Sequence, residues 1–99
     1  MDINKYQIVS SIAGRDKGRL FIVMETEPNF VYLVDGKLRK IEQPKKKRAK
    51  HVAFAGDLGE RLADKINSGE KVLNSEIRRA LAEFSNEIGE GDAPSSIGR

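Results

Sequence analysis

Short apolar stretches separated by turn residues fill the first 56 residues of the 99-residue chain. Most of them are rich in β-branched and aromatic side chains, as half-buried strands tend to be, and one, residues 37–43, is mixed and expected to be more exposed. They predict strands over residues 7–13, 19–26, 30–34, 37–43 and 52–55. Five short antiparallel strands punctuated by Gly, Pro and Asp favour a small barrel over an open sheet.

The predicted turns carry residues that suit tight backbone geometry. Gly14 and Gly18 bracket three polar residues, and glycine adopts positive φ without a steric penalty. This pair predicts a tight loop between the first two strands. Asp35-Gly36 predicts a two-residue hairpin turn after the third strand. Pro44 would end the fourth strand, because proline donates no backbone hydrogen bond.

Beyond the last predicted strand, the spacing of apolar residues becomes helical. Leu58, Leu62 and Ile66 recur four residues apart and predict a helix with Asp57 as its N-cap and Gly69 as its stop.

A second helix is predicted to begin near Asn74-Ser75. Its apolar stripe consists of Ile77, Ala80, Leu81, Phe84 and Ile88. That stripe either packs on the barrel or docks a protein partner.

The composition limits the class of protein. A chain of 99 residues without cysteine supports one small domain and excludes disulfides, thiol catalysis and cysteine-ligated metals. The N-terminus lacks the basic and apolar segments of a signal peptide. No apolar run approaches the roughly 20 residues that span a bilayer. We therefore expect a soluble cytoplasmic protein that does not bind membranes.

Positive charge is concentrated in the first half of the chain. Residues 1–56 hold 12 Lys/Arg and 6 Asp/Glu, whereas residues 57–99 hold 6 and 9. A basic module with an acidic appendage is typical of a protein that binds a polyanion. The cations lie at the tip of the first loop, in the predicted fourth strand, and in the basic run that follows it. They are Arg15, Lys17, Arg19, Arg39, Lys40, Lys45, Lys46, Lys47, Arg48 and Lys50.

Two interpretations of these cations are open. They can neutralise phosphate groups and gain affinity by releasing counterions, or they can form a merely solvated surface. In the first case Gly14 and Gly18 let the loop approach a phosphate backbone closely. The aromatic residues mostly lie in apolar runs and are expected in the core. We therefore expect binding to folded RNA through charge and shape, with little reading of bases.

Enzymatic chemistry finds little support in the sequence. His51 is the only histidine, and Ser10 and Ser11 lie in a predicted strand without a nearby base. The glycine patterns of P-loop and Rossmann nucleotide sites are missing. With one histidine and no cysteine, only carboxylates remain as metal ligands. We expect no catalysis, no cofactor, no metal and no small-molecule substrate.

The run from Val9 to Gly18, closed by an apolar strand, resembles the KOW motif of ribosomal proteins and NusG-type transcription factors. Gly18 corresponds to the hallmark glycine of that motif. The continuation over residues 32–36 and 38–40 is similar to the ribosomal protein known as L-fourteen-e and its small bacterial relatives. Leu20-Phe21 stands where many KOW motifs carry another glycine, which favours this branch over the NusG branch.

The resemblance implies an SH3-like barrel of the KOW type, which we assign to residues 1–56. The helical extension would cover residues 57–88, and the Gly- and Ser-rich residues 89–99 predict a disordered tail. The resemblance also implies a non-catalytic ribosomal or ribosome-associated protein that binds ribosomal RNA in translation, with ribosomal proteins as further partners. An alternative stays open: a protein-interaction module of the transcription or translation machinery.

Overall fold

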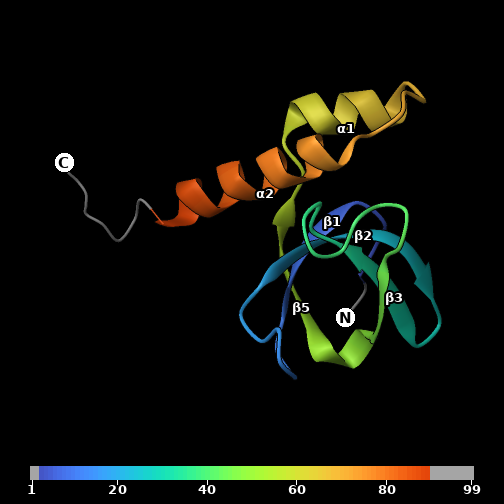
Figure 1. Ribbon diagram of the computed structural model, residues 1–99, viewed down its shortest axis with the longest axis vertical. Coiled ribbons are helices and arrows are strands. Elements are labelled where there is room, and N and C mark those ends of the chain that lie inside the picture. Colours follow the sequence, from blue (N-terminus) through green and yellow to red (C-terminus); the bar gives the residue numbers. More distant parts are fainter. Residues whose placement is uncertain (1–2, 90–99) are drawn as a thin grey trace.

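The computed structural model describes residues 3–89 as an antiparallel sheet followed by two helices (Figure 1). This confirms the prediction of a mainly β chain with C-terminal helices. The elements are β1 (Gln7–Ser11), β2 (Leu20–Glu27), β3 (Phe30–Val34), β4 (Lys45–Arg48), the 3₁₀ turn η1 (Ala49–His51), β5 (Val52–Asp57), α1 (Glu60–Asn67) and α2 (Asn74–Gly89).

The five strands form one sheet in the order β4-β3-β2-β1-β5. Each neighbouring pair is antiparallel, and β4 and β5 form the two edges. The turn η1 connects these two edges directly, so the chain passes from one side of the sheet to the other through three residues. Hydrogen-bonded pairing of β4 with β5, which would close a barrel, is not present among the described residues.

The prediction of a strand over residues 37–43 is wrong, because the backbone amides of this segment are bonded elsewhere. Asp35 Oδ1 accepts hydrogen bonds from the N–H groups of Lys37 (2.9 Å) and Arg39 (2.8 Å). The N–H of Ile41 donates to Oδ1 of Asn74, the first residue of α2 (2.8 Å). The segment is therefore a loop held by side chains, and it cannot extend the ladder of the sheet.

The fourth strand is instead the basic run that was expected to follow the strand predicted over residues 37–43. β4 pairs with β3 from Lys45 opposite Leu33 to Arg48 opposite Phe30. The two-residue hairpin predicted before it is also wrong, since residues 35–44 connect the two strands. The turn itself is present, and Gly36 has the expected positive φ of +77°.

Both faces of the sheet are buried, which explains why its central strands read as nearly continuous apolar runs. The core on the helix side consists of Ile8, Ile22, Val34, Leu62, Ile77 and Leu81. The core on the other side consists of Val9, Phe21, Val23, Val31, Leu33 and Val52. This second core joins side chains from β1, β2, β3 and β5. Figure 1 shows that the sheet is bent.

The first helix begins later than predicted. Asp57 was expected to be its N-cap, but this residue pairs with Gln7 as the last residue of β5. Gly59 precedes α1 instead and gives no side-chain cap. The predicted stop is confirmed, because Gly69 follows the helix with φ of +80° and its N–H donates to the carbonyl of Ile66 (3.0 Å).

The second helix begins at Asn74, as predicted, and its apolar stripe packs against the sheet. Ile77 and Leu81 are buried there, with Phe84 packed beside them. Figure 1 shows both helices on the same side of the sheet. Gly89, predicted to begin the tail, is the last residue of α2. The rest of the predicted tail, residues 90–99, lies outside the described residues.

Neither helix within residues 3–89 has the length and apolar character needed to cross a membrane.

Candidate nucleic-acid interface

The loop between β1 and β2, residues 12–19, carries the first group of predicted cations. Gly14 and Gly18 have φ angles of +85° and +90°, which confirms the predicted left-handed geometry. The N–H of Gly18 donates to the last carbonyl of β1 (2.8 Å) and closes the loop. Arg15 and Lys17 are exposed on it.

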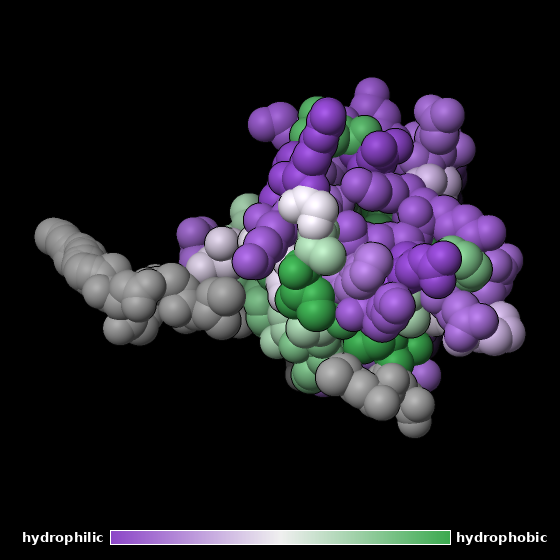
Figure 2. All heavy atoms as spheres, turned by 90° about the horizontal axis from the view of Figure 1, so that it is seen from below, coloured by the Kyte–Doolittle hydropathy of each residue, from purple (hydrophilic) through white to green (hydrophobic). Residues whose placement is uncertain are grey.

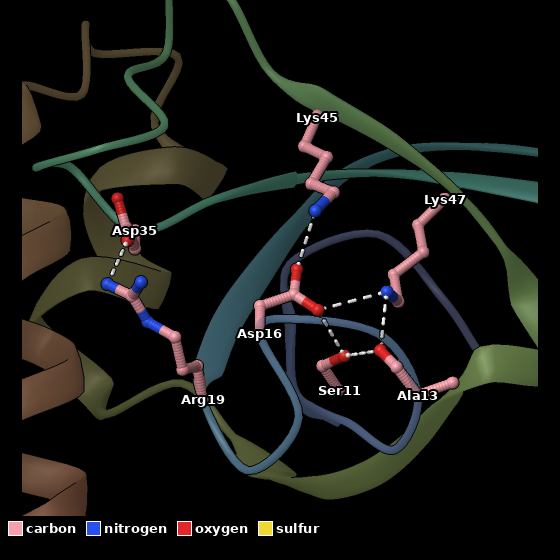
Figure 3. Close-up of polar contacts among 7 residues, drawn as sticks. All are labelled: Ser11, Ala13, Asp16, Arg19, Asp35, Lys45 and Lys47. Atoms are coloured by element: carbon pink, nitrogen blue, oxygen red, sulfur yellow. Dashed lines mark hydrogen bonds and ion pairs between the residues drawn. The ribbon is translucent and has the colours of Figure 1, made fainter.

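A buried carboxylate holds this loop against β4. Asp16 is only 7% exposed, and its Oδ1 accepts hydrogen bonds from Ser11 Oγ (2.8 Å) and Lys47 Nζ (3.0 Å). Its Oδ2 accepts a hydrogen bond from Lys45 Nζ (2.8 Å). Lys47 Nζ also donates to the carbonyl oxygen of Ala13 (3.0 Å). Figure 3 shows both lysines reaching from β4 towards Asp16, so one carboxylate joins the loop to the edge strand.

The carboxylate of Asp16 is ionised at neutral pH. Burial raises its pKa, but hydrogen bonds from Lys45, Ser11 and Lys47, together with the charge of Lys45, outweigh the cost of burial. The pKa of Asp16 therefore lies well below its ordinary value. Two ammonium groups share this one negative charge, so the cluster as a whole remains positive.

The hydrogen bonds to Asp16 divide the four residues of β4 into two that hold the loop and two that do not. Side chains alternate between the faces of a strand, so Lys45 and Lys47 turn towards Asp16 while Lys46 and Arg48 are exposed. The side chain of Lys47 is only 10% exposed. Its ammonium group therefore helps to hold the loop on β4, whereas the sequence predicted Lys47 as a phosphate ligand.

Beside the Asp16 cluster lies a groove with a volume of about 300 Å³, which we call the cationic groove. Four of its lining side chains are cations and two are carboxylates. The lining residues are Arg15, Asp16, Arg19, Phe21, Asp35, Leu38, Arg39 and Lys45. The groove brings together cations from the first loop, from the loop after β3 and from β4, which are far apart in the sequence.

The second carboxylate of the groove also has a structural role. Asp35 is buried, and its Oδ1 accepts the two backbone hydrogen bonds that close the loop after β3. Its Oδ2 lies 3.5 Å from Arg19 Nη2, as Figure 3 shows. Arg15 and Arg39 line the same groove and are exposed. These two guanidinium groups are the ones best placed for a phosphate, because guanidinium binds phosphate in a bidentate manner.

Lys46 and Arg48 lie over aromatic rings on the outer face of β3 and β4. Lys46 Nζ is 4.4 Å from the centre of the Phe30 ring and 5.9 Å from that of Tyr32. The guanidinium carbon of Arg48 is 5.7 Å from the Phe30 ring. Such cation–π contacts stabilise exposed cations modestly. Lys46 also lies 3.9 Å from Glu27, which reduces its net charge effect.

A third basic region surrounds a larger hollow at the end of the molecule that holds η1. Arg48 and Lys50 line this hollow, which has a volume of about 670 Å³. Ile12 and Val52 contribute apolar side chains to it. Figure 2 shows the molecule from below the view of Figure 1, with hydrophilic side chains over most of the surface and hydrophobic ones gathered in smaller patches.

The structure therefore brings the predicted site residues together only in part. Arg15, Arg19, Arg39 and Lys45 line the cationic groove, whereas Lys46, Arg48 and Lys50 lie elsewhere on the surface. Lys17 and Lys40 are exposed outside the lining of the groove. Gly14 and Gly18 shape the loop that carries the first cations, and Lys47 is part of its anchor.

Sequence reasoning missed the two aspartates that organise this region. From the sequence, Asp16 was treated only as one of the three polar residues between Gly14 and Gly18, and Asp35 only as part of a turn. A signal was available: each lies between or beside glycines at the end of an apolar strand, where a short carboxylate can bond to nearby backbone or side-chain donors. The partners of Asp16, 29 and 31 residues away along the chain, could not be read from that signal.

Within residues 3–89, no three His, Asp or Glu side chains are grouped so that they could hold a metal ion. No protein-family model matches the chain, and no curated protein matches it. The resemblance to KOW proteins therefore rests on the quoted residues alone and stays a prediction.

Proposed function

We propose that this chain is a non-catalytic RNA-binding protein that binds ribosomal RNA as a ribosomal or ribosome-associated protein in translation. The observation that supports this most is the cationic groove, in which four cations from three separate segments face one hollow. Arg15 and Arg39 form no ion pair with another residue among 3–89. In this proposal their guanidinium groups contact phosphates. Two buried aspartates hold the loops that present them.

We further propose that the sheet is an SH3-like barrel of the KOW type. The strand order, the core enclosed on the side away from the helices, and the short turn η1 between the two edge strands all support this assignment. In this barrel the loop with Gly14 and Gly18 is the KOW loop. It presents Arg15 and Lys17 to the RNA backbone, with most of the affinity coming from counterion release.

The alternative, a protein-interaction module, depended on the apolar stripe of α2 as a docking face. Ile77 and Leu81 of that stripe are buried against Ile8 and Ile22 of the sheet. The stripe therefore already has a partner within the chain, and we do not favour the alternative.

Sedimentation of cell lysate through sucrose gradients at low and high salt tests the proposal. We expect the chain to migrate with the large ribosomal subunit at low salt and to be reduced or lost there at high salt, since an electrostatic contact weakens with salt. Retention at high salt would identify a resident ribosomal protein. Migration at the top of the gradient under both conditions would contradict the proposal.

A further inference from the structure

Leu38 is the most exposed large hydrophobic side chain described, at 64%. It lines the cationic groove, whose lining also includes Arg15, Arg39 and Lys45. A single exposed leucine is common on protein surfaces. This one differs because it lies among cations that the proposed function assigns to phosphates.

The loop that carries Leu38 is held firmly by hydrogen bonds. The N–H groups on either side of it, those of Lys37 and Arg39, both donate to Asp35 Oδ1. The carbonyl of Arg39 accepts hydrogen bonds from the N–H groups of Asp35 (2.9 Å) and Gly36 (3.0 Å). Arg78 Nη1 of α2 donates to the carbonyl of Gly36 (2.6 Å). The leucine is thus presented by a fixed turn.

The chemistry of the groove selects its ligand. Its cations suit phosphates, but a regular RNA duplex offers a leucine no apolar surface, because the faces of its bases are stacked inside the helix. An unpaired base at a bulge or loop exposes a flat apolar face beside its own phosphates. Such a nucleotide satisfies both the cations and Leu38 at the same time.

We propose that the cationic groove binds RNA at an unpaired nucleotide, with Arg15 and Arg39 on the flanking phosphates and the base packed on Leu38. This proposal rests on the proposed function and adds the class of RNA. It also revises the expectation that the protein reads bases little, since it makes one base contact by shape and apolar surface.

The test compares two RNA hairpins that differ only by one nucleotide: one has a perfect stem, and the other has the same stem with a single bulged nucleotide. We expect the wild-type chain to bind the bulged hairpin about tenfold more tightly in fluorescence anisotropy, as stacking or apolar contact with one base would give. The Leu38→Ala variant should lose this preference while its affinity for the perfect stem stays the same. The matched control is Leu73→Ala, which removes a leucine that is 49% exposed and does not line the groove.

A second measurement reports the contact directly. The methyl resonances of Leu38 should shift upfield on addition of the bulged hairpin, because an aromatic base shields protons above its face, and should not shift with the perfect stem.

Several outcomes would overturn the proposal. If wild-type protein binds both hairpins equally, or if Leu38→Ala keeps the preference, Leu38 makes no base contact although RNA binding stands. Loss of a co-purifying protein in Leu38→Ala, without any change in RNA binding, would assign the residue to a protein interface. Absence of RNA binding by the wild-type chain would instead refute the proposed function itself.

Discussion

Asp16 shows how one buried carboxylate can organise a surface rich in cations. Its buried carboxylate fixes Lys45 and Lys47 and holds the loop on β4. Because Asp16 points inward, its neighbours Arg15 and Lys17 are exposed. Asp16 therefore reduces the net charge of the basic run and also holds the loop on which Arg15 and Lys17 are exposed.

Replacing Asp16 with Asn should lower the free energy of unfolding by about 2–4 kcal/mol at pH 7, because two lysine ammonium groups lose their buried counter-charge. Chemical denaturation measures this change. Asp57→Asn is the matched control, since Asp57 is exposed at the end of β5, and it should stay within about 0.5 kcal/mol of wild type. Equal effects of the two variants would contradict the structural role of Asp16.

The low pKa of Asp16 predicts how stability depends on pH. In the unfolded chain the pKa of an aspartate is about 3.9, and in the folded chain that of Asp16 is lower. Its contribution is complete above the unfolded value and is lost as pH falls towards the folded value, where the folded chain also takes up the proton. Between roughly pH 5 and pH 2, wild-type stability should fall more steeply than that of Asp16→Asn. Parallel curves in urea unfolding would exclude this linkage.

At the scale of elements, α2 does more than cover the sheet. Its first residue, Asn74, accepts a hydrogen bond from the Ile41 amide and donates one to Glu42 Oε1 (2.9 Å). The bond from Asn74 is the main reason that the pKa of Glu42 is lowered. Arg78 binds the carbonyl of Gly36 from the next turn of the helix. The helix therefore positions the loop that carries three lining residues of the groove, Asp35, Leu38 and Arg39.

Loss of the Asn74 side chain should loosen this loop without unfolding the protein. In Asn74→Ala the amide of Ile41 loses its acceptor, so its hydrogen exchange should be faster by about fivefold to tenfold, as expected for a hydrogen bond worth roughly 1 kcal/mol. Ser75→Ala alters the neighbouring exposed residue and serves as the control. Unchanged exchange at Ile41 in Asn74→Ala would show that the helix does not hold the loop.

Close packing of α2 on β5 requires a glycine in the strand. A Cβ atom at Gly56 would lie closer to the Phe84 ring than van der Waals contact allows, whereas a Cβ at Gly59 would meet nothing within 4 Å. Gly56→Ala should therefore destabilise the protein by about 1–3 kcal/mol, and Gly59→Ala by about 0.5 kcal/mol or less. Thermal unfolding compares the two.

The same substitution in a Phe84→Ala background isolates the contact. With the ring removed, Gly56→Ala should have little further effect, and the difference between the two backgrounds is the interaction free energy. An equal cost with and without Phe84 would mean that the strand, and not the helix, requires glycine.

At the scale of the whole molecule, the sequence predicted the features that depend on residues close together in the chain. It predicted four of the five strands, the start of α2, and the left-handed glycines at positions 14, 18 and 69. It did not predict the conformation of segments that are held by side chains far away in the sequence. The amide of Ile41 is bonded by a residue 33 positions away, so residues 37–43 are a loop. Lys45 and Lys47 can lie side by side in a strand because both ammonium groups donate hydrogen bonds to Asp16.

The candidate site, too, could be predicted only in part from the sequence. Sequence identified the cations, because charge is visible without a fold, but it treated the basic run as one surface. Alternation along β4 separates Lys45 and Lys47 from Lys46 and Arg48, and only a paired strand has that alternation. The convergence of Arg15 and Arg39 on one groove likewise depends on how the two loops are held.

The most direct test of the whole account is the salt dependence of RNA binding in two variants that lose the same charge. Arg15→Ala/Arg39→Ala removes the two exposed guanidinium groups of the cationic groove and leaves Arg19 and Lys45 in place. Lys46→Ala/Arg48→Ala removes the cations on the outer face of β4. We expect the first variant to flatten the slope of log affinity against log salt by about 0.7–0.9 for each lost phosphate contact. The second variant should keep a slope closer to that of wild type. Equal slopes in the two variants, or a larger change in the second, would contradict a groove centred on Arg15 and Arg39.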